Sequence, residues 1–169
     1  MENIKILVLD VDGTLTDGKI YVDDKDNSFK AFNVKDGFAL VNWLKLGGEV
    51  AILTGKKSNI VERRAEELGI KYVIQGSKNK TQDLKKLLDR LNISFENTAY
   101  MGDDLNDLGV MKNVALSGCP KDSVQEVLEI SNFISTKIGG DGAVREFLEY
   151  IMKNNGMWEK ILEKYSNEW

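Results

Sequence analysis

The sequence contains no histidine and only one cysteine, Cys119. A single cysteine cannot form a disulfide within the chain, and the absence of histidine excludes a Cys-His catalytic pair and the common kinds of zinc site. There is also only one proline, and no linker rich in proline, glycine or serine marks a domain boundary. Any catalysis must therefore depend on carboxylates, lysines and hydroxyl groups.

Strong charge of one sign and long apolar runs are absent as well. The net charge is -4, and the charged residues are spread along the chain, which disfavours nucleic-acid binding. No apolar run approaches the roughly 20 residues that span a bilayer, and the first residues lack the layout of a signal peptide. We therefore expect a cytoplasmic protein that has neither a membrane nor a nucleic acid as its partner.

Short apolar segments alternate along the chain with segments of helical periodicity. Two predicted helices, over 84–91 and 144–151, carry apolar residues three or four positions apart. This alternation predicts an α/β fold, a three-layer Rossmann-like parallel sheet with helices on its faces. The predicted strands are Lys5–Leu9, Val50–Leu53, Tyr72–Ile74, Ala99–Met101, Val114–Leu116 and Phe133–Ile134.

Residues 16–33 interrupt this alternation after the first strand. Apolar segments at Lys19–Val22 and Ser28–Phe32 flank a polar turn, which predicts a β-hairpin that projects from the domain. Its apolar side chains exceed what a two-stranded ribbon can bury, so we expect another subunit to cover them. Residues 1–152 are then a single domain that includes this hairpin.

Residues 153–169 are predicted to form a C-terminal helical tail. Its apolar residues recur at helical spacing, which indicates packing or a subunit contact and not chemistry. They are Trp158, Ile161, Leu162 and Tyr165.

Two aspartates directly follow the first predicted strand, at the edge where open α/β sheets bind ligands. Asp10 is placed to attack phosphorus, while Asp12 can protonate the leaving oxygen and later accept a proton from water. Gly13 allows the tight turn that this requires. A carboxylate and a phosphate charge repel by about 4 kcal/mol at roughly 4 Å and an effective dielectric of about 20. Cations must offset this repulsion.

Groups that bind phosphate follow two later strands. The Thr54 hydroxyl and the amides after Gly55 can donate to phosphate oxygens, and Lys80 supplies a fixed positive charge.

Further carboxylates follow the fourth predicted strand. Asp103, Asp10 and the Asp12 carbonyl make an all-oxygen set that suits Mg²⁺. We expect Asp104 to join this site through water or to orient Lys80.

These segments resemble, in their order, the four motifs of the haloacid dehalogenase superfamily of phosphatases, and the resemblance covers nearly the whole chain. It implies Mg²⁺-dependent hydrolysis of a phosphomonoester through an aspartyl-phosphate. The motifs are Asp10-Val11-Asp12-Gly13-Thr14, Leu53-Thr54-Gly55, Lys80 and Gly102-Asp103-Asp104-Leu105-Asn106-Asp107.

The sequence leaves no room for the cap domain that closes the site in most of this superfamily. Only 41 residues separate Asp12 from Thr54, and the hairpin and one helix use most of them. Between Lys80 and Asp103 there is room for one helix and a strand. The chain therefore resembles capless members, which form homotetramers whose hairpins and chain ends complete neighbouring sites.

A narrower resemblance, carried by residues 30–37, 54–58, 62–64, 75–80 and 139–146, implies an eight-carbon keto sugar acid phosphate as substrate, with a nine-carbon, sialic-acid-type phosphate as the alternative. Lys35, Lys56 and Arg64 are the bases expected to meet its carboxylate or hydroxyls. Lys56 stands where several relatives have arginine, and Asp141 is acidic where some have arginine.

Three of these aspartates also have a purely structural interpretation. Asp12 and Asp103 are each suited to capping a helix, and Asp107 suits capping as well as catalysis. Arg64 lies as easily on a solvated helix face as in a site. Three carboxylates that converge on one sheet edge repel one another without a metal, which favours the catalytic interpretation.

Two other classes of protein stay open. A signalling receiver domain also combines aspartates, a threonine and a lysine, but lacks an acid two residues after the phosphorylated aspartate. A non-catalytic scaffold is the second alternative, and here every motif residue that the reaction needs is present.

Overall fold

The computed structural model of the chain describes residues 4–25 and 27–167. A six-stranded sheet runs in the order β5-β4-β1-β6-β7-β8, and each neighbouring pair is parallel. The α/β fold expected from the sequence is confirmed. The strands are β1 (Ile6–Leu9), β4 (Glu49–Thr54), β5 (Tyr72–Gln75), β6 (Thr98–Met101), β7 (Leu116–Cys119) and β8 (Phe133–Ile134).

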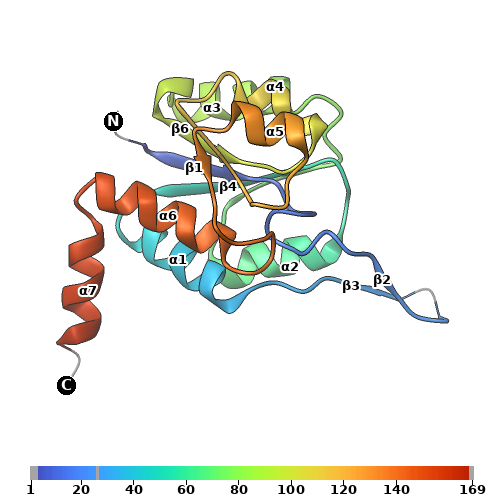
Figure 1. Cartoon of the computed structure of the whole chain (residues 1–169), viewed down its shortest axis with the longest axis horizontal. Helices are drawn as coiled ribbons and strands as arrows, with labels where there is room; N and C mark the ends of the chain where they lie inside the picture. Colours follow the sequence, from blue (N-terminus) through green and yellow to red (C-terminus); the bar gives the residue numbers. More distant parts are fainter. Residues whose placement is uncertain (1–3, 26, 168–169) are drawn as a thin grey trace.

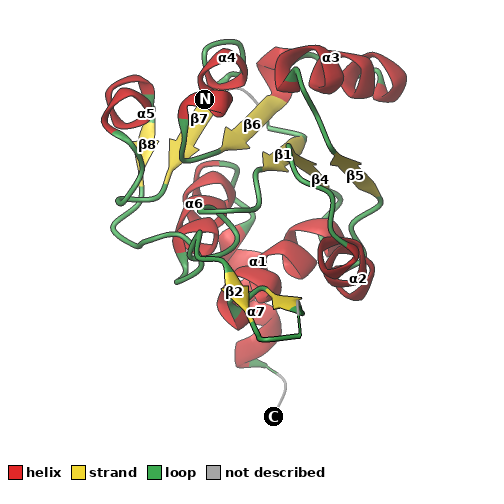
Figure 2. Ribbon diagram, turned by 90° about the vertical axis from the view of Figure 1, so that its right-hand side faces the viewer, coloured by secondary structure: helices red, strands yellow, loops and turns green. Residues whose placement is uncertain are grey.

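Helices cover both faces of the sheet and make three layers (Figure 2). On one face lie α1 (Val34–Lys45), α2 (Asn59–Leu68) and α6 (Ala143–Asn154); on the other lie α3 (Lys80–Leu91), α4 (Leu108–Met111) and α5 (Gln125–Ile130). Alternate residues of β1 enter opposite cores, because successive strand side chains point to opposite faces. Leu7 and Leu9 pack in one core with Trp43, and Ile6 and Val8 in the other.

The strand predicted at Val114–Leu116 is displaced by two residues, since β7 runs over Leu116–Cys119. Its segment Ser-Gly-Cys has few strong strand formers, but the glycine is required by packing. A Cβ at Gly118 would lie 2.9 Å from the Phe147 ring. Packing against α6, and not the β-propensity of its residues, therefore determines where this strand lies.

The projecting hairpin is present, with shorter strands than predicted. They are β2 (Tyr21–Val22) and β3 (Ser28–Phe29), which pair antiparallel and extend away from the sheet (Figure 1). The predicted polar turn includes residue 26, which lies outside the described residues.

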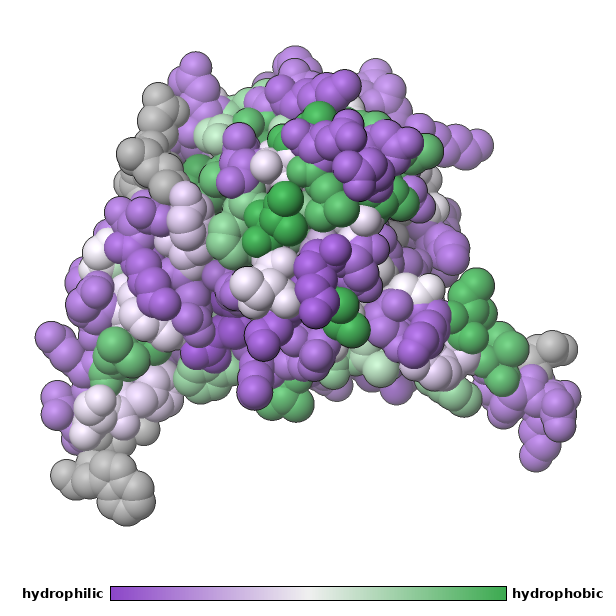
Figure 3. All heavy atoms as spheres, viewed as in Figure 1, coloured by the Kyte–Doolittle hydropathy of each residue, from purple (hydrophilic) through white to green (hydrophobic). Residues whose placement is uncertain are grey.

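Three apolar side chains of the hairpin are exposed: Ile20 by 75%, Val22 by 66% and Phe29 by 53%. Figure 3 shows green, hydrophobic atoms on the part of the surface that the hairpin forms. Ile20 and Val22 lie on one face of the hairpin, whereas Phe29 lies on the other beside Tyr21. These three exposed residues are together called the hairpin strip below.

Neither position that could hold a cap domain carries one within the described residues. The hairpin and α1 occupy the chain between Asp12 and Thr54. Between Lys80 and Asp103 lie α3, a 3₁₀ turn (Phe95–Asn97) and β6. The described helices include none that is long and apolar enough to cross a membrane.

The C-terminal helix α7 (Trp158–Ser166) descends beside α1 and α6 (Figure 1). Ile161 is 5% exposed and joins the core beneath it. The Tyr165 hydroxyl donates to Asn42 Oδ1 at 3.2 Å, and the Arg145 guanidinium lies 5.2 Å from the Trp158 ring. This helix packs against the domain, as its spacing suggested.

Replacing Ile161 tests how much α7 contributes to stability. We expect Ile161→Ala to lower the free energy of unfolding by about 2 kcal/mol, because it leaves a cavity in the core. The matched variant Lys160→Ala removes an exposed side chain of the same helix and should change it by less than about 0.5 kcal/mol. Urea unfolding of both variants measures this difference, and equal losses would show that α7 is not anchored through Ile161.

Candidate active site

The sequence motifs converge at the carboxyl edge of the sheet because β1 lies between β4 and β6. Asp10 follows β1 directly, Thr54 ends β4, and Asp103 comes two residues after β6. Asp10 and Thr54 are 5% and 3% exposed. Gly55 is exposed at the start of the loop that leads to α2. Residues far apart in the chain thus form one cluster.

Lys80 is the centre of this cluster. It begins α3, where the Asn79 side chain caps the helix by accepting from Gln82 N–H. Its Nζ lies 2.8 Å from Asp10 Oδ1 and 2.7 Å from Asp107 Oδ1, and the residue is 5% exposed. A buried ammonium between two carboxylates is stabilised by both, and it fixes their positions in turn.

Both carboxylate oxygens of Asp107 accept two hydrogen bonds each. Oδ1 accepts from Lys80 and from the Tyr100 hydroxyl at 2.5 Å, while Oδ2 accepts from the N–H groups of Asp103 at 3.0 Å and Asp104 at 3.3 Å. These four donors match the lone pairs of one carboxylate. Gly102 makes the approach possible, since a Cβ there would lie 2.3 Å from the Asp107 carboxyl carbon.

Asp103 is held beside the loop that follows β1. The Thr14 hydroxyl donates to its Oδ1 at 3.1 Å. Gly13 has φ +92°, and a Cβ on it would lie 2.0 Å from Asp103 Oδ2. Only glycine therefore fits between Asp10 and Asp103, both for its backbone conformation and for space.

The crowded charges shift the pKa values of the cluster. Burial, then the charge of Asp107, raises the pKa of Asp10 to about 6 although Lys80 opposes the shift. Burial and the charges of Asp10 and Asp107 raise the pKa of Asp103 to about 7. Burial alone would lower the pKa of Lys80, but Asp10 and Asp107 outweigh it and raise that pKa. Negative charge is therefore in excess here.

The donor set fits a divalent cation. Asp10, Asp103 and Asp107 each offer a carboxylate oxygen, and these oxygens lie within 4.8 Å of one another. Three carboxylates and the one ammonium of Lys80 leave a formal charge of −2. Because Asp107 is occupied by four donors, Asp10 and Asp103 are the side chains left for a metal. Hard oxygen ligands of this kind suit Mg²⁺.

Asp12 lies apart from the carboxylate cluster and pairs with lysines. Its Oδ1 forms an ion pair with Lys30 Nζ at the foot of the hairpin, and its Oδ2 lies 4.0 Å from Lys56 Nζ. The Asp12 side chain is 25% exposed, so it faces the opening of the site and not its floor.

A groove beside Asp12 separates the hairpin from the loop after β4. Its volume is about 190 Å³, and four of its nine lining residues are lysines. Such a surface favours an anionic occupant. The lysines are Lys19, Lys30, Lys56 and Lys57.

Of the two roles expected of Asp104, the contact with Lys80 is not found, because Asp107 makes it. The Asp104 side chain is exposed and accepts from the N–H of Leu105 at 2.7 Å, as the cap of a 3₁₀ turn (Leu105–Asp107). Asp107, not Asp104, contacts Lys80. The reason is the turn itself, which brings the third residue after Asp104 back towards the sheet edge.

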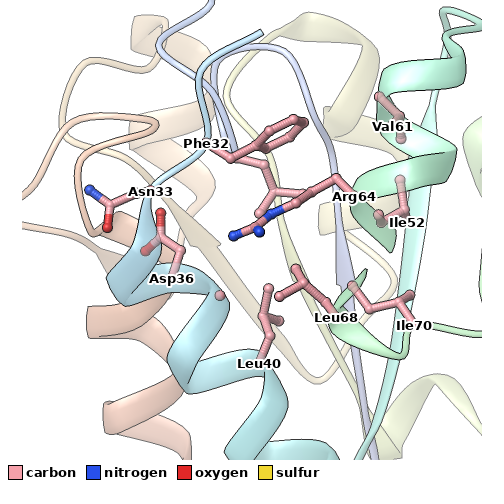
Figure 4. A pocket seen from close by; sticks show the side chains of 11 residues that line it. Phe32, Asn33, Asp36, Leu40, Ile52, Val61, Arg64, Leu68 and Ile70 are labelled. Carbon is pink, nitrogen blue, oxygen red and sulfur yellow. The ribbon is translucent and has the colours of Figure 1, made fainter. Parts of the chain in front are cut away.

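Two of the three predicted substrate-binding bases lie outside the groove. Lys35 is exposed in the first turn of α1. Arg64 lies in the second turn of α2 and faces Asp36 across a small cavity among apolar side chains (Figure 4). Its guanidinium covers the Phe32 ring at 5.7 Å, and it pairs with Glu67 at 3.3 Å. Arg64 therefore supports the packing of α1 on α2.

The cavity between Arg64 and Asp36 has a volume of about 10 Å³, room for one water molecule. Asp36 Oδ2 and Arg64 Nε are buried without a hydrogen-bond partner among the described residues.

Three side chains of the site were not predicted from the sequence. They are Tyr100, Thr14 and Lys30. Tyr100 looks like an ordinary strand residue, and Lys30 follows a hairpin strand where lysine is usually solvated. Thr14 was visible within the first motif. Only the fold shows that these three side chains reach aspartates.

Comparison with known proteins agrees with this geometry. The family described as haloacid dehalogenase-like hydrolase matches residues 29–115. A 3-deoxy-D-manno-octulosonate 8-phosphate phosphatase of Escherichia coli K12 is 43% identical over 155 residues, which are 92% of this chain and 82% of that protein.

Solved structures give the same result. A probable phosphatase from Pseudomonas syringae superposes with a TM-score of 0.97 at 39% identity, over 99% of this chain and 96% of that one. A 3-deoxy-D-manno-octulosonate 8-phosphate phosphatase from Moraxella catarrhalis, crystallised with magnesium, phosphate and the free sugar acid, has a TM-score of 0.91 at 39% identity, covering 95% and 92%. The chain belongs to the haloacid dehalogenase-like hydrolase family.

Proposed function

We propose that this protein is a magnesium-dependent phosphatase that hydrolyses 3-deoxy-D-manno-octulosonate 8-phosphate to the free sugar acid and phosphate. The observation that carries the proposal is the buried Lys80, which bridges Asp10 and Asp107 at the sheet edge beside Asp103. A lysine held there neutralises the nucleophile and remains near an incoming phosphoryl group.

Asp10 is the proposed nucleophile. One of its oxygens forms the new bond to phosphorus while the bond from phosphorus to the leaving oxygen breaks, which gives an aspartyl-phosphate. Lys80 and the Thr54 hydroxyl stabilise the negative charge on the phosphoryl oxygens. Asp10, Asp103 and the Asp12 carbonyl would hold Mg²⁺, which offsets the repulsion between carboxylate and phosphate when bound.

Asp12 is the proposed acid and base. It gives its proton to the leaving oxygen in the first step. In the second step it takes a proton from water, whose oxygen attacks phosphorus as the bond to Asp10 breaks. Its exposure at the opening of the site, with the nucleophile buried behind it, suits contact with both a leaving group and water.

The lysine-lined groove supports an anionic leaving group. Lys30 and Lys56, which line the groove, also contact Asp12, and Lys19 and Lys57 complete its four lysines. A sugar acid offers a carboxylate to the ammonium groups of Lys56 and Lys57. The similarity to the Escherichia coli and Moraxella catarrhalis phosphatases supports the eight-carbon acid over the nine-carbon alternative.

We also propose that the protein acts in the cytoplasm as a homotetramer. The hairpin strip is the support for assembly, because its three apolar side chains remain exposed in the single chain. A substrate with several charges does not cross a bilayer unaided, so the enzyme must share the compartment in which that substrate is made.

Phosphate release tests the proposed reaction. We expect the purified protein to release phosphate in the presence of Mg²⁺ and to prefer the eight-carbon acid phosphate over the nine-carbon acid phosphate and hexose phosphates. A chelator should abolish release. Asp10→Asn should lower turnover at least 10³-fold, by an order-of-magnitude estimate, with unchanged folding by circular dichroism. Wild-type turnover in that variant would refute the nucleophile.

The metal site predicts a pH-dependent stability. Because the pKa values of Asp10 and Asp103 are raised to about 6 and about 7, the native state binds more protons than the unfolded chain above about pH 4. In metal-free protein their contribution to stability therefore falls as pH rises from about 4 to between 6 and 7, and it changes little above that range.

Thermal unfolding from pH 4 to pH 8 measures this effect. Without metal, Asp103→Asn should unfold at a higher temperature than the wild type at pH 8, since it removes a repelled charge, and the two should converge near pH 4. Added Mg²⁺ should stabilise the wild type by about 2.7 kcal/mol at 100 times its dissociation constant, and the variant far less. A variant that is less stable than metal-free wild type at pH 8 would contradict the assignment.

The hairpin strip predicts the effect of a charge on assembly. Val22→Glu should dissociate the tetramer, because a carboxylate buried in an apolar contact is strongly unfavourable. Lys25→Glu places a carboxylate on the same ribbon outside the strip and should leave assembly intact. Light scattering coupled to size-exclusion chromatography gives the mass of each variant, and an unchanged tetramer in Val22→Glu would remove the strip from the interface.

A further inference from the structure

The hairpin sends one side chain into the site of its own chain. Lys30 follows β3 directly, and its Nζ forms an ion pair with Asp12 Oδ1. The Lys30 side chain is 17% exposed, whereas that of Lys56, the other lysine near Asp12, is 64% exposed. Of these two contacts, the one from the hairpin is the shielded and therefore the stronger one.

The backbone on both sides of Lys30 is fixed. Phe29 pairs with Tyr21 across the hairpin, and their rings lie 6.2 Å apart. On the other side, Phe32 packs against the core and the Asn33 side chain caps α1 by accepting from Lys35 N–H. Lys30 therefore reaches Asp12 from a short segment that is anchored at each end.

Asp12 has few other constraints. Asp10 and Asp107 are buried and held by Lys80, whereas Asp12 is a partly exposed carboxylate on the loop after β1. The acid in this reaction must point at the leaving oxygen within hydrogen-bond reach, so its orientation matters for the rate.

We propose that Lys30 is a positioning residue that holds the Asp12 carboxyl towards the leaving group. This inference rests on the proposed phosphatase function. It makes the hairpin part of the catalytic apparatus of its own chain, in addition to its expected place in an interface. A phosphate-binding role for Lys30 is the competing explanation, and the two differ in how they depend on the leaving group.

The experiment compares two substrates in single-turnover measurements with Mg²⁺. The alkoxide of a sugar phosphate needs a proton as it leaves, whereas p-nitrophenolate, from p-nitrophenyl phosphate, leaves without one. Lys30→Met should lower the rate constant of phosphoryl transfer at least about 10-fold for the sugar phosphate, within the 10²- to 10⁴-fold that general acids supply. For the aryl phosphate, the loss should be less than about threefold.

Variants of Asp12 complete the test. Asp12→Asn should show the same split between substrates, and Lys30→Met combined with Asp12→Asn should lose no more than Asp12→Asn alone, because both changes remove one interaction. Lys30→Arg should recover most of the sugar phosphate rate. Lys25→Met, on the exposed part of the hairpin, is the matched control and should behave as the wild type.

Equal losses on both substrates, or losses that multiply in the double variant, would overturn the positioning role and favour phosphate binding. Normal rates in Lys30→Met would also overturn it. If the wild type turned over neither substrate, or if Asp12→Asn showed no split, the proposed function itself would fail. Circular dichroism and light scattering on each variant keep loss of folding or assembly separate from these outcomes.

Discussion

The site depends on one buried ion-pair arrangement, the Lys80 ammonium between Asp10 and Asp107. Removing charges from water is costly, and an arrangement of this kind persists only where every partner is hydrogen-bonded. Tyr100 and two backbone N–H groups satisfy the rest of Asp107, so the unit is complete. It links α3, β1 and the loop after β6, and it fixes the Asp10 carboxylate in place.

The same arrangement explains why the neighbouring positions tolerate so little change. Gly13 and Gly102 leave no space for a Cβ because the carboxylates of Asp103 and Asp107 occupy it. Negative charge is concentrated at the price of mutual repulsion, which the raised pKa values of Asp10 and Asp103 express. A folded chain that keeps such an unfavourable cluster is prepared for a cation, and preorganised charge is the usual basis of phosphoryl-transfer sites.

Much of this was predictable from the sequence, for definite reasons. Alternating periodicity gave the sheet, and the rule that ligands bind at the carboxyl ends of parallel strands brought Asp10, Thr54, Lys80 and Asp103 together. The predictions that the structure does not bear out depend on the direction of single side chains. Whether Asp104 or Asp107 contacts Lys80 is determined by one 3₁₀ turn.

Other failures have the same origin in tertiary contacts. Arg64 lies in the second turn of α2 and covers the Phe32 ring, outside the residues that line the groove. The predicted position of β7 was wrong by two residues. Gly118 is needed there because the Phe147 ring of α6 packs against it, and the local sequence does not reveal this contact.

The loop before α6 sets a boundary on how this enzyme can change. A Cβ on Gly139 would lie 1.8 Å from the Gly13 carbonyl oxygen, and the Gly140 N–H donates to the Thr14 carbonyl at 3.1 Å. Backbone touches backbone beside the loop that follows Asp10, so Gly139 and Gly140 leave no space for an added side chain. New substrate preferences must then evolve on the opposite wall, through the hairpin and the loop over 55–58, where side chains already face open space.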